Sequence, residues 1–156
     1  MKRYQDKPTI LAHFLTKCGI DTNVLVDLIL YPSSKEYFEQ RGYSFPDKCL
    51  CITRQVLGET KGVLIHKYGF SEEKADKEIK AILDLFFIEI LPYVSVYDDI
   101  EEVERIGKKY SLNEEDIRII YSFWKCNLKL VIVRDRAFEK TCEELNIQTV
   151  VWPIFP

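Results

Sequence analysis

The sequence predicts a single α/β domain with three layers, in which helices cover both faces of a central, mostly parallel sheet. The chain has 156 residues, 47% of them hydrophobic, which is enough for one domain with a substantial core. Short segments of β-favouring residues alternate with longer segments of helical periodicity, a pattern typical of parallel sheets. The apolar run LKLVIV at 128–133 has no polar alternation after Lys129, as expected for a strand covered on both faces.

The first half of the chain is expected to contain two strands and four helices. A short strand precedes a helix that starts near Asn23, and Thr53 and Ser71 are placed as N-caps of later helices. The helix after Ser71 has apolar residues at helical spacing, which indicates one buried stripe. In order, the elements are a strand at 17–21, a helix from 23, a Ser-capped helix at 33–43, a strand at 50–53, and helices at 54–69 and 71–87.

The second half continues the alternation. The segment FIEILPY is expected to form a strand whose length Pro92 limits. Two helices are expected after it, with a break between them near Tyr110 and Ser111. No repeat, low-complexity tract or interdomain linker interrupts the pattern. The expected elements are a strand at 87–93, helices at 98–110 and 112–127, a strand at 128–133, a helix at 136–147 and a strand at 148–152.

The overall charge excludes a broad basic surface for nucleic acid. The chain has 22 basic and 25 acidic residues, a net charge of −3. A polyanionic ligand would therefore need a local basic patch or a metal ion. No apolar run reaches the ~20 residues of a membrane helix, and the amino end lacks a signal-peptide cleavage site. We expect no membrane association and a cytoplasmic location, with residues 1–17 forming an extension before the domain at 18–156.

The five cysteines favour reduced thiols rather than a disulfide framework. Their number is odd, they are scattered, and no CxxC pair occurs. Cys49 and Cys51 alternate as in a strand and point to one face, which is poor spacing for zinc. We expect buried cysteines that act as small hydrophobic residues.

Two aspartates lie where parallel strands are expected to end. Asp21 closes the first strand, directly between two apolar segments, and Asp135 follows the apolar run by two residues. Ligands of open parallel sheets collect outside the carboxyl ends of the strands. The two carboxylates are therefore expected at one edge of the sheet.

Helical spacing adds two further acids to this edge. Glu59 follows Val56 by three residues and precedes Val63 by four, so we expect it to face inward with them. Asp116 begins the apolar stripe of its helix, whereas the neighbouring Glu114 and Glu115 are expected to face solvent.

Each acid also has an ordinary structural explanation. Asp21, Asp116 and Asp135 could cap or flank helix amino ends, where an acid gains ~0.3–1 kcal/mol, and Glu59 could pair with a lysine. A cluster of all four is different, because carboxylates 4 Å apart repel by ~4 kcal/mol per pair at an effective dielectric near 20. A hard divalent cation such as Mg²⁺ or Mn²⁺, which prefers oxygen ligands, would compensate this charge.

The motifs around these acids resemble those of PIN-domain nucleases, particularly VapC-type toxin ribonucleases. The similar segments are GIDTNVL with Asp21, VLGET with Glu59, SLNEEDIRII with Asp116 and VIVRDRAFEK with Asp135. The resemblance extends from about residue 18 to the carboxyl end, in the same order and spacing. It implies a compact α/β/α fold and Mg²⁺- or Mn²⁺-dependent cleavage of single-stranded RNA.

The resemblance also implies roles and partners. Asp21, Asp116 and Asp135 would bind metal, and Glu59 would complete the catalytic set by holding a metal-bound water or a second ion. Asn23 would fix the site by hydrogen bonding. The family further implies a homodimer and, for a toxin of a type II toxin–antitoxin pair, a VapB-type antitoxin. Basic residues near the rim could position RNA: Arg118, Arg134 and Arg136.

One departure from the family pattern leaves a second interpretation of the function open. Val133 stands where the family often has Thr or Ser, two residues before the last acid, although Phe138 matches. The alternative is a non-catalytic PIN scaffold that binds RNA or a protein partner without cutting. His13 and His66 have no recognisable catalytic partners and are expected to be structural.

Overall fold

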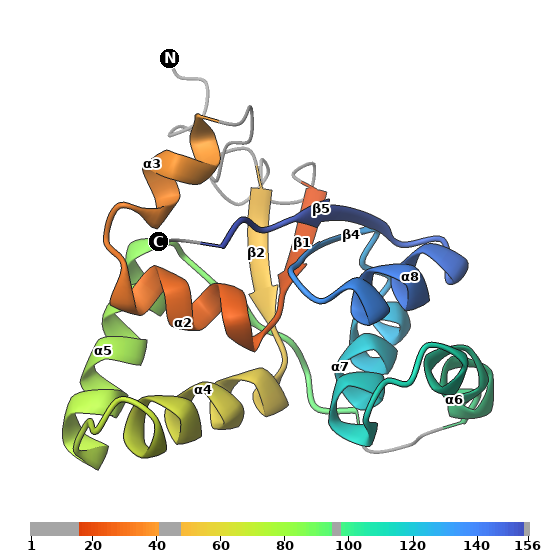
Figure 1. Ribbon diagram of the computed structural model, residues 1–156, viewed down its shortest axis with the longest axis horizontal. Coiled ribbons are helices and arrows are strands. Elements are labelled where there is room, and N and C mark those ends of the chain that lie inside the picture. Colours follow the sequence, from red (N-terminus) through yellow and green to blue (C-terminus); the bar gives the residue numbers. More distant parts are fainter. Residues whose placement is uncertain (1–15, 41–47, 95–97, 155–156) are drawn as a thin grey trace.

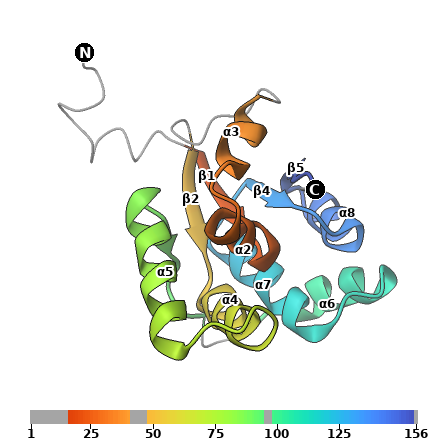
Figure 2. The same cartoon turned by 60° about the vertical axis from the view of Figure 1, so that its left-hand side comes forward.

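Helices cover both faces of a five-stranded sheet in the computed structural model (Figure 1). The structure describes residues 16–40, 48–94 and 98–154. Helices α2, α4 and α5 pack together on one side, whereas α6, α7 and α8 pack together on the other (Figures 1 and 2). This is the predicted three-layer α/β/α architecture.

The sheet is parallel throughout, with the strand order β3-β2-β1-β4-β5. Its central strand β1 pairs with β2 on one side and with β4, which comes late in the sequence, on the other. All carboxyl ends of the strands therefore meet at one edge. The strands are β1 Thr16–Ile20, β2 Lys48–Ile52, β3 Glu89–Ile90, β4 Leu130–Val133 and β5 Gln148–Val151.

The helices follow the predicted order, and most begin at a residue that accepts a capping hydrogen bond. The hydroxyls of Thr53 and Ser71 accept from the backbone N–H groups of Val56 at 3.0 Å and Lys74 at 3.1 Å, as predicted. The helices are α2 Thr22–Leu30, α3 Ser34–Glu39, α4 Arg54–His66, α5 Glu72–Leu85, α6 Ile100–Lys109, α7 Glu114–Lys125 and α8 Arg136–Glu144.

Several elements are a few residues shorter than predicted, and two of them differ most from the sequence-based bounds. The strand expected at 87–93 has only two residues, since Phe87 has a positive φ of 52° and Pro92 cannot donate a ladder hydrogen bond. The helix expected at 33–43 ends at Glu39, and Ser33 makes no side-chain capping bond. Its remaining predicted residues, 41–43, lie outside the described part of the chain.

The predicted amino-terminal extension, residues 1–17, falls mostly outside the described residues. Its last two residues, Thr16 and Lys17, belong to β1.

The core lies on both faces of the central strands. Every residue of β4 is buried, as its continuous apolar sequence predicted. Gly19 in β1 allows α7 to approach closely, because a Cβ at this position would lie 2.8 Å from a ring carbon of Phe123. This contact fixes α7 against the sheet, and with it the acid in its first turn.

Among the helices in the described part of the chain, none is long and apolar enough to cross a membrane.

Candidate metal centre at the carboxyl edge of the sheet

Asp21 is a buried carboxylate at the point where the central strand becomes a helix. It follows β1 directly and is the N-cap of α2, with Oδ1 accepting from the backbone N–H of Val24 at 3.2 Å. The side chain is only 6% exposed. The capping explanation for Asp21 is thus correct, but it uses one oxygen atom and does not account for the burial.

Asp135 occupies the equivalent place after the neighbouring strand. It is the N-cap of α8, and its Oδ1 accepts from the backbone N–H of Ala137 at 3.0 Å. Unlike Asp21, it is exposed. Since β1 and β4 are paired in parallel, both capping carboxylates lie beyond the same edge of the sheet.

Asp116 lies in the first turn of α7 and is half-buried, whereas Glu114 and Glu115 are exposed, as predicted. The cap of this helix is Asn113, whose Oδ1 accepts from the backbone N–H of Asp116 at 2.8 Å. The carboxylate of Asp116 is therefore not the cap and faces the edge of the sheet.

Glu59 is held from two sides on α4. Its Oε1 accepts from the Thr22 hydroxyl at 2.7 Å, and its Oε2 accepts from the Gln55 amide at 3.4 Å. The buried face of α4 carries Val56, Thr60 and Leu64, so half-buried Glu59 stands beside this face rather than within it. The hydrogen bond from Thr22 to Glu59 was not predicted from the sequence. The position of Thr22 directly after Asp21, at the start of a helix, was the one local indication of this role.

The four carboxylates are electrostatic neighbours. Burial is the main cause that raises the pKa of Asp21 to about 7, and the negative charges of Asp116 and Asp135 contribute to this shift. Burial likewise raises the pKa of Asp116 to about 6, with contributions from Glu59 and Asp135. The hydrogen bond from Val24 and the guanidinium of Arg134 oppose the shift at Asp21 without cancelling it. The edge therefore holds more negative charge than its own side chains neutralise.

This donor set fits a hard divalent cation. All four side chains offer carboxylate oxygens, and the capping bonds of Asp21 and Asp135 each engage only one oxygen. No three of these four acids, all of which are described, bring donor oxygens within 4.8 Å of one another. Mg²⁺ usually keeps several waters and binds through one or two carboxylates, so it does not require three of these acids as direct ligands.

An open groove adjoins this centre along α4. It has a volume of about 590 Å³ and is lined by Thr22, Glu59, Gly62, Val63, His66 and Lys67. His66 and Lys67 are exposed there. The groove gives the acidic edge a surface along which an extended ligand could lie.

Two predictions about neighbouring polar residues need correction. Arg134 does not face outward: it donates to the buried carboxylate of Asp27 and, at 3.2 Å, to the carbonyl of Pro153. Asn23 is exposed, and the hydrogen bond from this segment to Glu59 comes from Thr22 instead. The inward turn of Arg134 follows from Asp27, which needs a partner for its buried charge.

Arg118 is exposed and lies 3.5 Å from Glu114, and Arg136 is exposed. His66 lies on the exposed side of α4, and His13 is outside the described residues. Val133 in β4 and Phe138 in α8 are both buried and belong to the hydrophobic core.

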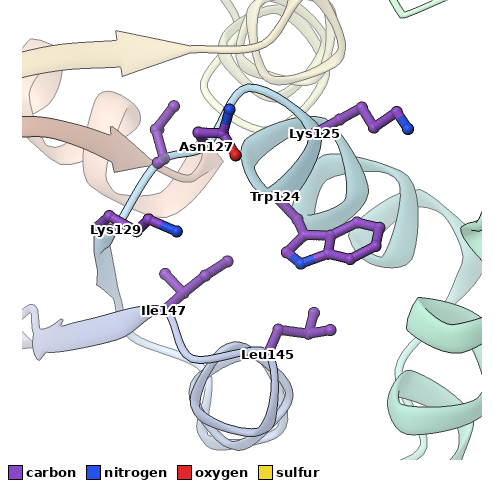
Figure 3. Close-up of a pocket in the computed structure, with 7 residues that line it drawn as sticks. Trp124, Lys125, Asn127, Lys129, Leu145 and Ile147 are labelled. Carbon is purple, nitrogen blue, oxygen red and sulfur yellow. The ribbon is translucent and has the colours of Figure 1, made fainter.

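A smaller cavity lies at the opposite end of the sheet (Figure 3). Its volume is about 280 Å³, and its lining includes Trp124, Lys125, Asn127, Lys129 and Ile147. These residues precede β4 and β5, at the amino ends of the strands, and Lys125 lies 3.5 Å from Asp99. This cavity is therefore separate from the acidic edge.

Comparison with solved structures identifies this fold. A chain of VapBC2 from Rickettsia felis, in a crystal structure bound to a DNA fragment from their promoter, aligns with 88% of this chain and 100% of its own length, with a TM-score of 0.67 and 15% identity. PAE2754 from Pyrobaculum aerophilum aligns with 88% of this chain and 91% of its own, with a TM-score of 0.54 and 14% identity.

Sequence comparison is less informative. No model of a protein family matches the chain. A mannitol-1-phosphate 5-dehydrogenase from Halalkalibacterium halodurans is 45% identical over 56 residues, which are 36% of this chain but only 13% of that protein. Since this match covers so little of the dehydrogenase, the assignment depends on the structural comparison: the chain has a PIN/VapC-like fold.

Proposed function

We propose that this chain is a Mg²⁺- or Mn²⁺-dependent endoribonuclease that hydrolyses phosphodiester bonds of single-stranded RNA. The main support is the electrostatic coupling of buried Asp21 with Asp116 and Asp135 at the carboxyl edge of a PIN/VapC-like fold. Folding alone gives no reason to gather like charges, whereas a cation-dependent reaction on phosphate does.

Asp21, Asp116 and Asp135 would hold the cation, with Glu59 at its margin. When bound, the ion would activate water and offset the charge that develops on the scissile phosphate. The hydroxyl of Thr22 and the amide of Gln55 fix both oxygens of Glu59, so this carboxylate is oriented before substrate arrives.

The groove beside Glu59 would take the substrate strand. Its open, elongated shape suits an extended single strand, and Lys67 supplies a positive charge for phosphate. RNA is favoured over a small metabolite because the groove is wide rather than an enclosed pocket.

Purified protein incubated with single-stranded RNA tests this proposal. We expect cleavage with Mg²⁺ or Mn²⁺, none with EDTA, and none for Asp21→Asn. Asp84→Asn is the matched control, since Asp84 is an exposed aspartate on α5. Cleavage that persists unchanged in Asp21→Asn would come from a contaminant and reject the assignment.

The alternative, a PIN scaffold that binds RNA or a protein without cutting, is tested by the same samples. RNA binding without cleavage in any divalent ion would favour it. Val133, which lacks the hydroxyl that the family often has two residues before Asp135, is the sequence feature that favours this scaffold.

We further propose that the chain is the toxin of a type II toxin–antitoxin pair in the cytoplasm, acts as a homodimer and binds a VapB-type antitoxin. The support is the similarity to a chain of the VapBC2 complex. Co-expression with the product of an adjacent small reading frame should relieve growth arrest and give a co-purifying complex. Growth arrest that this product does not relieve would reject the pairing.

A further inference from the structure

A second group of possible metal ligands lies away from the acidic edge, where β2 pairs with β3. The thiols of Cys49 and Cys51 and a carboxylate oxygen of Glu89 all lie within 4.8 Å of one another. Cys51 and Glu89 are register partners across the two strands, and Cys49 points to the same face because it is two residues before Cys51. The spacing of Cys49 and Cys51 alone indicated poor zinc ligation, but the structure adds a third ligand, because Glu89 reaches the two cysteines through strand pairing.

Strand register also shows which face of the sheet carries these side chains. Lys17 and Gly19 of β1 are paired with Cys49 and Cys51. A Cβ on Gly19 would contact Phe123, so this is the face that α7 covers. Cys126, the C-cap of α7, is near enough that Lys17 and Glu89 both influence the pKa of its thiol.

The polar contacts within the group connect a thiol, a carboxylate and an ammonium. Glu89 accepts from the Lys17 ammonium at 3.3 Å and from the Cys49 thiol at 3.9 Å. Cys51 is fully buried behind them, and this burial raises the pKa of its thiol. Lys17 and Glu89 are 46% and 40% exposed, which gives a path from solvent to the sulfur atoms.

We propose that Cys49, Cys51 and Glu89 form a second cation site, selective for a thiophilic divalent ion of the Zn²⁺ class. On binding, each thiol loses its proton to solvent as its sulfur–metal bond forms, and Glu89 binds as the carboxylate. Zinc–sulfur bonds of about 2.3 Å at a tetrahedral angle place two sulfurs about 3.8 Å apart, so sulfurs that now lie within 4.8 Å of each other need to move by at most about 1 Å. Water would take the fourth position.

The charges of the site support this assignment. Two thiolates and one carboxylate around a divalent ion leave one negative charge, which the ammonium of Lys17 balances. The donor set also separates this site from the acidic edge, because thiolates prefer Zn²⁺, whereas carboxylates and water suit Mg²⁺ and Mn²⁺. A bound ion would link β2 to β3, which has only two residues of its own. The site does not depend on the proposed nuclease function.

Titration of chelator-treated protein with Co²⁺ tests the site. We expect about one Co²⁺ per chain with sulfur-to-metal charge transfer and the intense visible bands of tetrahedral cobalt, displaced by Zn²⁺ but not by excess Mg²⁺. Cys49→Ser should abolish the charge-transfer band, and Glu89→Gln should weaken Co²⁺ binding by ~10-fold or more while leaving the fold intact, since Glu89 is half-exposed.

Two variants serve as controls. Cys142→Ala, in a distant buried cysteine of α8, and Asp21→Asn, at the acidic edge, should both retain the cobalt spectrum. Absence of charge transfer in the unsubstituted protein would overturn the proposal. A band that survives in Cys49→Ser but disappears in Cys126→Ser would also overturn it, because the ion would then bind at Cys126 and not at the proposed group. If the protein does not cleave RNA but shows the expected cobalt spectrum, the proposed nuclease function is wrong and the proposed cation site still stands.

Discussion

At the scale of single residues, Asp21 has two features with opposite effects on the stability of the fold. Its Oδ1 caps α2, and its burial beside other acids leaves its charge poorly compensated. Asn at this position keeps a side-chain oxygen for the cap but has no charge. We expect Asp21→Asn to reduce RNA cleavage by at least ~100-fold, or about 2.7 kcal/mol of transition-state stabilisation. Single-turnover rates at saturating Mn²⁺ measure this loss, and a rate within a few-fold of the parent would contradict it.

Thr22 tests whether Glu59 has to be held in position, because its hydroxyl contacts Glu59 and not the proposed substrate. Thr22→Val keeps the shape of the side chain but removes the 2.7 Å hydrogen bond to Oε1. A hydrogen bond to a charged group contributes ~1.5–3 kcal/mol, so we expect about a ten-fold fall in kcat with little change in KM. Thr22→Ser, which keeps the hydroxyl, should restore the rate. Equal rates for the Val and Ser variants would show that this bond has no positioning role.

At the scale of elements, one buried ion pair joins the helix after Asp21 to the turn before Asp135. Asp27 of α2 accepts from Arg134 and, at 2.8 Å, from the indole N–H of Trp152. Both Asp27 and Trp152 are buried, and Trp152 also stacks against Phe38 with ring centroids 4.7 Å apart. This network connects α2, α3 and the segment after β5, and so holds the two capping aspartates in their relative positions.

Asp27→Ala should destabilise the fold, since it removes the carboxylate partner of a half-buried guanidinium and of a buried indole N–H. Removing one member of a buried pair costs up to ~3–5 kcal/mol, and the partial exposure of Arg134 lowers our expectation to ~2–3 kcal/mol. Urea unfolding measures the change, with Asp84→Ala, on an exposed face, expected within ~0.5 kcal/mol of the parent. A similar small effect for Asp27→Ala would show that the network is dispensable.

The sequence predicted the order and type of every element, because strand composition, helical periodicity and capping residues are local signals. It could also place Asp21 and Asp135 at one edge, since both follow strands of a parallel sheet. It could not predict the inward turn of Arg134, which depends on Asp27, or the approach of Glu89 to Cys49 and Cys51. Those contacts join residues far apart in the chain, and no local pattern encodes them.

At the scale of the whole molecule, the acidic edge makes stability depend on pH. The pKa of Asp21 is about 7 in the folded chain, against an ordinary value of 3.8. Between these values the folded state binds a proton that the unfolded state does not, so the free energy of unfolding falls as pH rises through this window. Asp116, with a pKa of about 6, acts in the same direction.

In EDTA we therefore expect the free energy of unfolding to fall by ~1–3 kcal/mol between pH 5 and 8, at ~1.4 kcal/mol per pKa unit with allowance for solvent screening. Asp21→Asn should remove most of this dependence of the unfolding free energy on pH. Mg²⁺ should also reduce the dependence, because it binds the ionised carboxylates of the acidic edge. Urea unfolding at several pH values, with and without Mg²⁺, measures both effects. Stability that rises over this range in EDTA would contradict the account.

The central position of β1 has a consequence for synthesis of the chain. Asp21 is synthesised well before β4, and β1 gains β4 as its second neighbour only when the segment that leads to Asp135 has been made. Until then the carboxylates belong to separate segments of the growing chain. The acidic edge can therefore form only after Asp135 has been synthesised, long after Asp21.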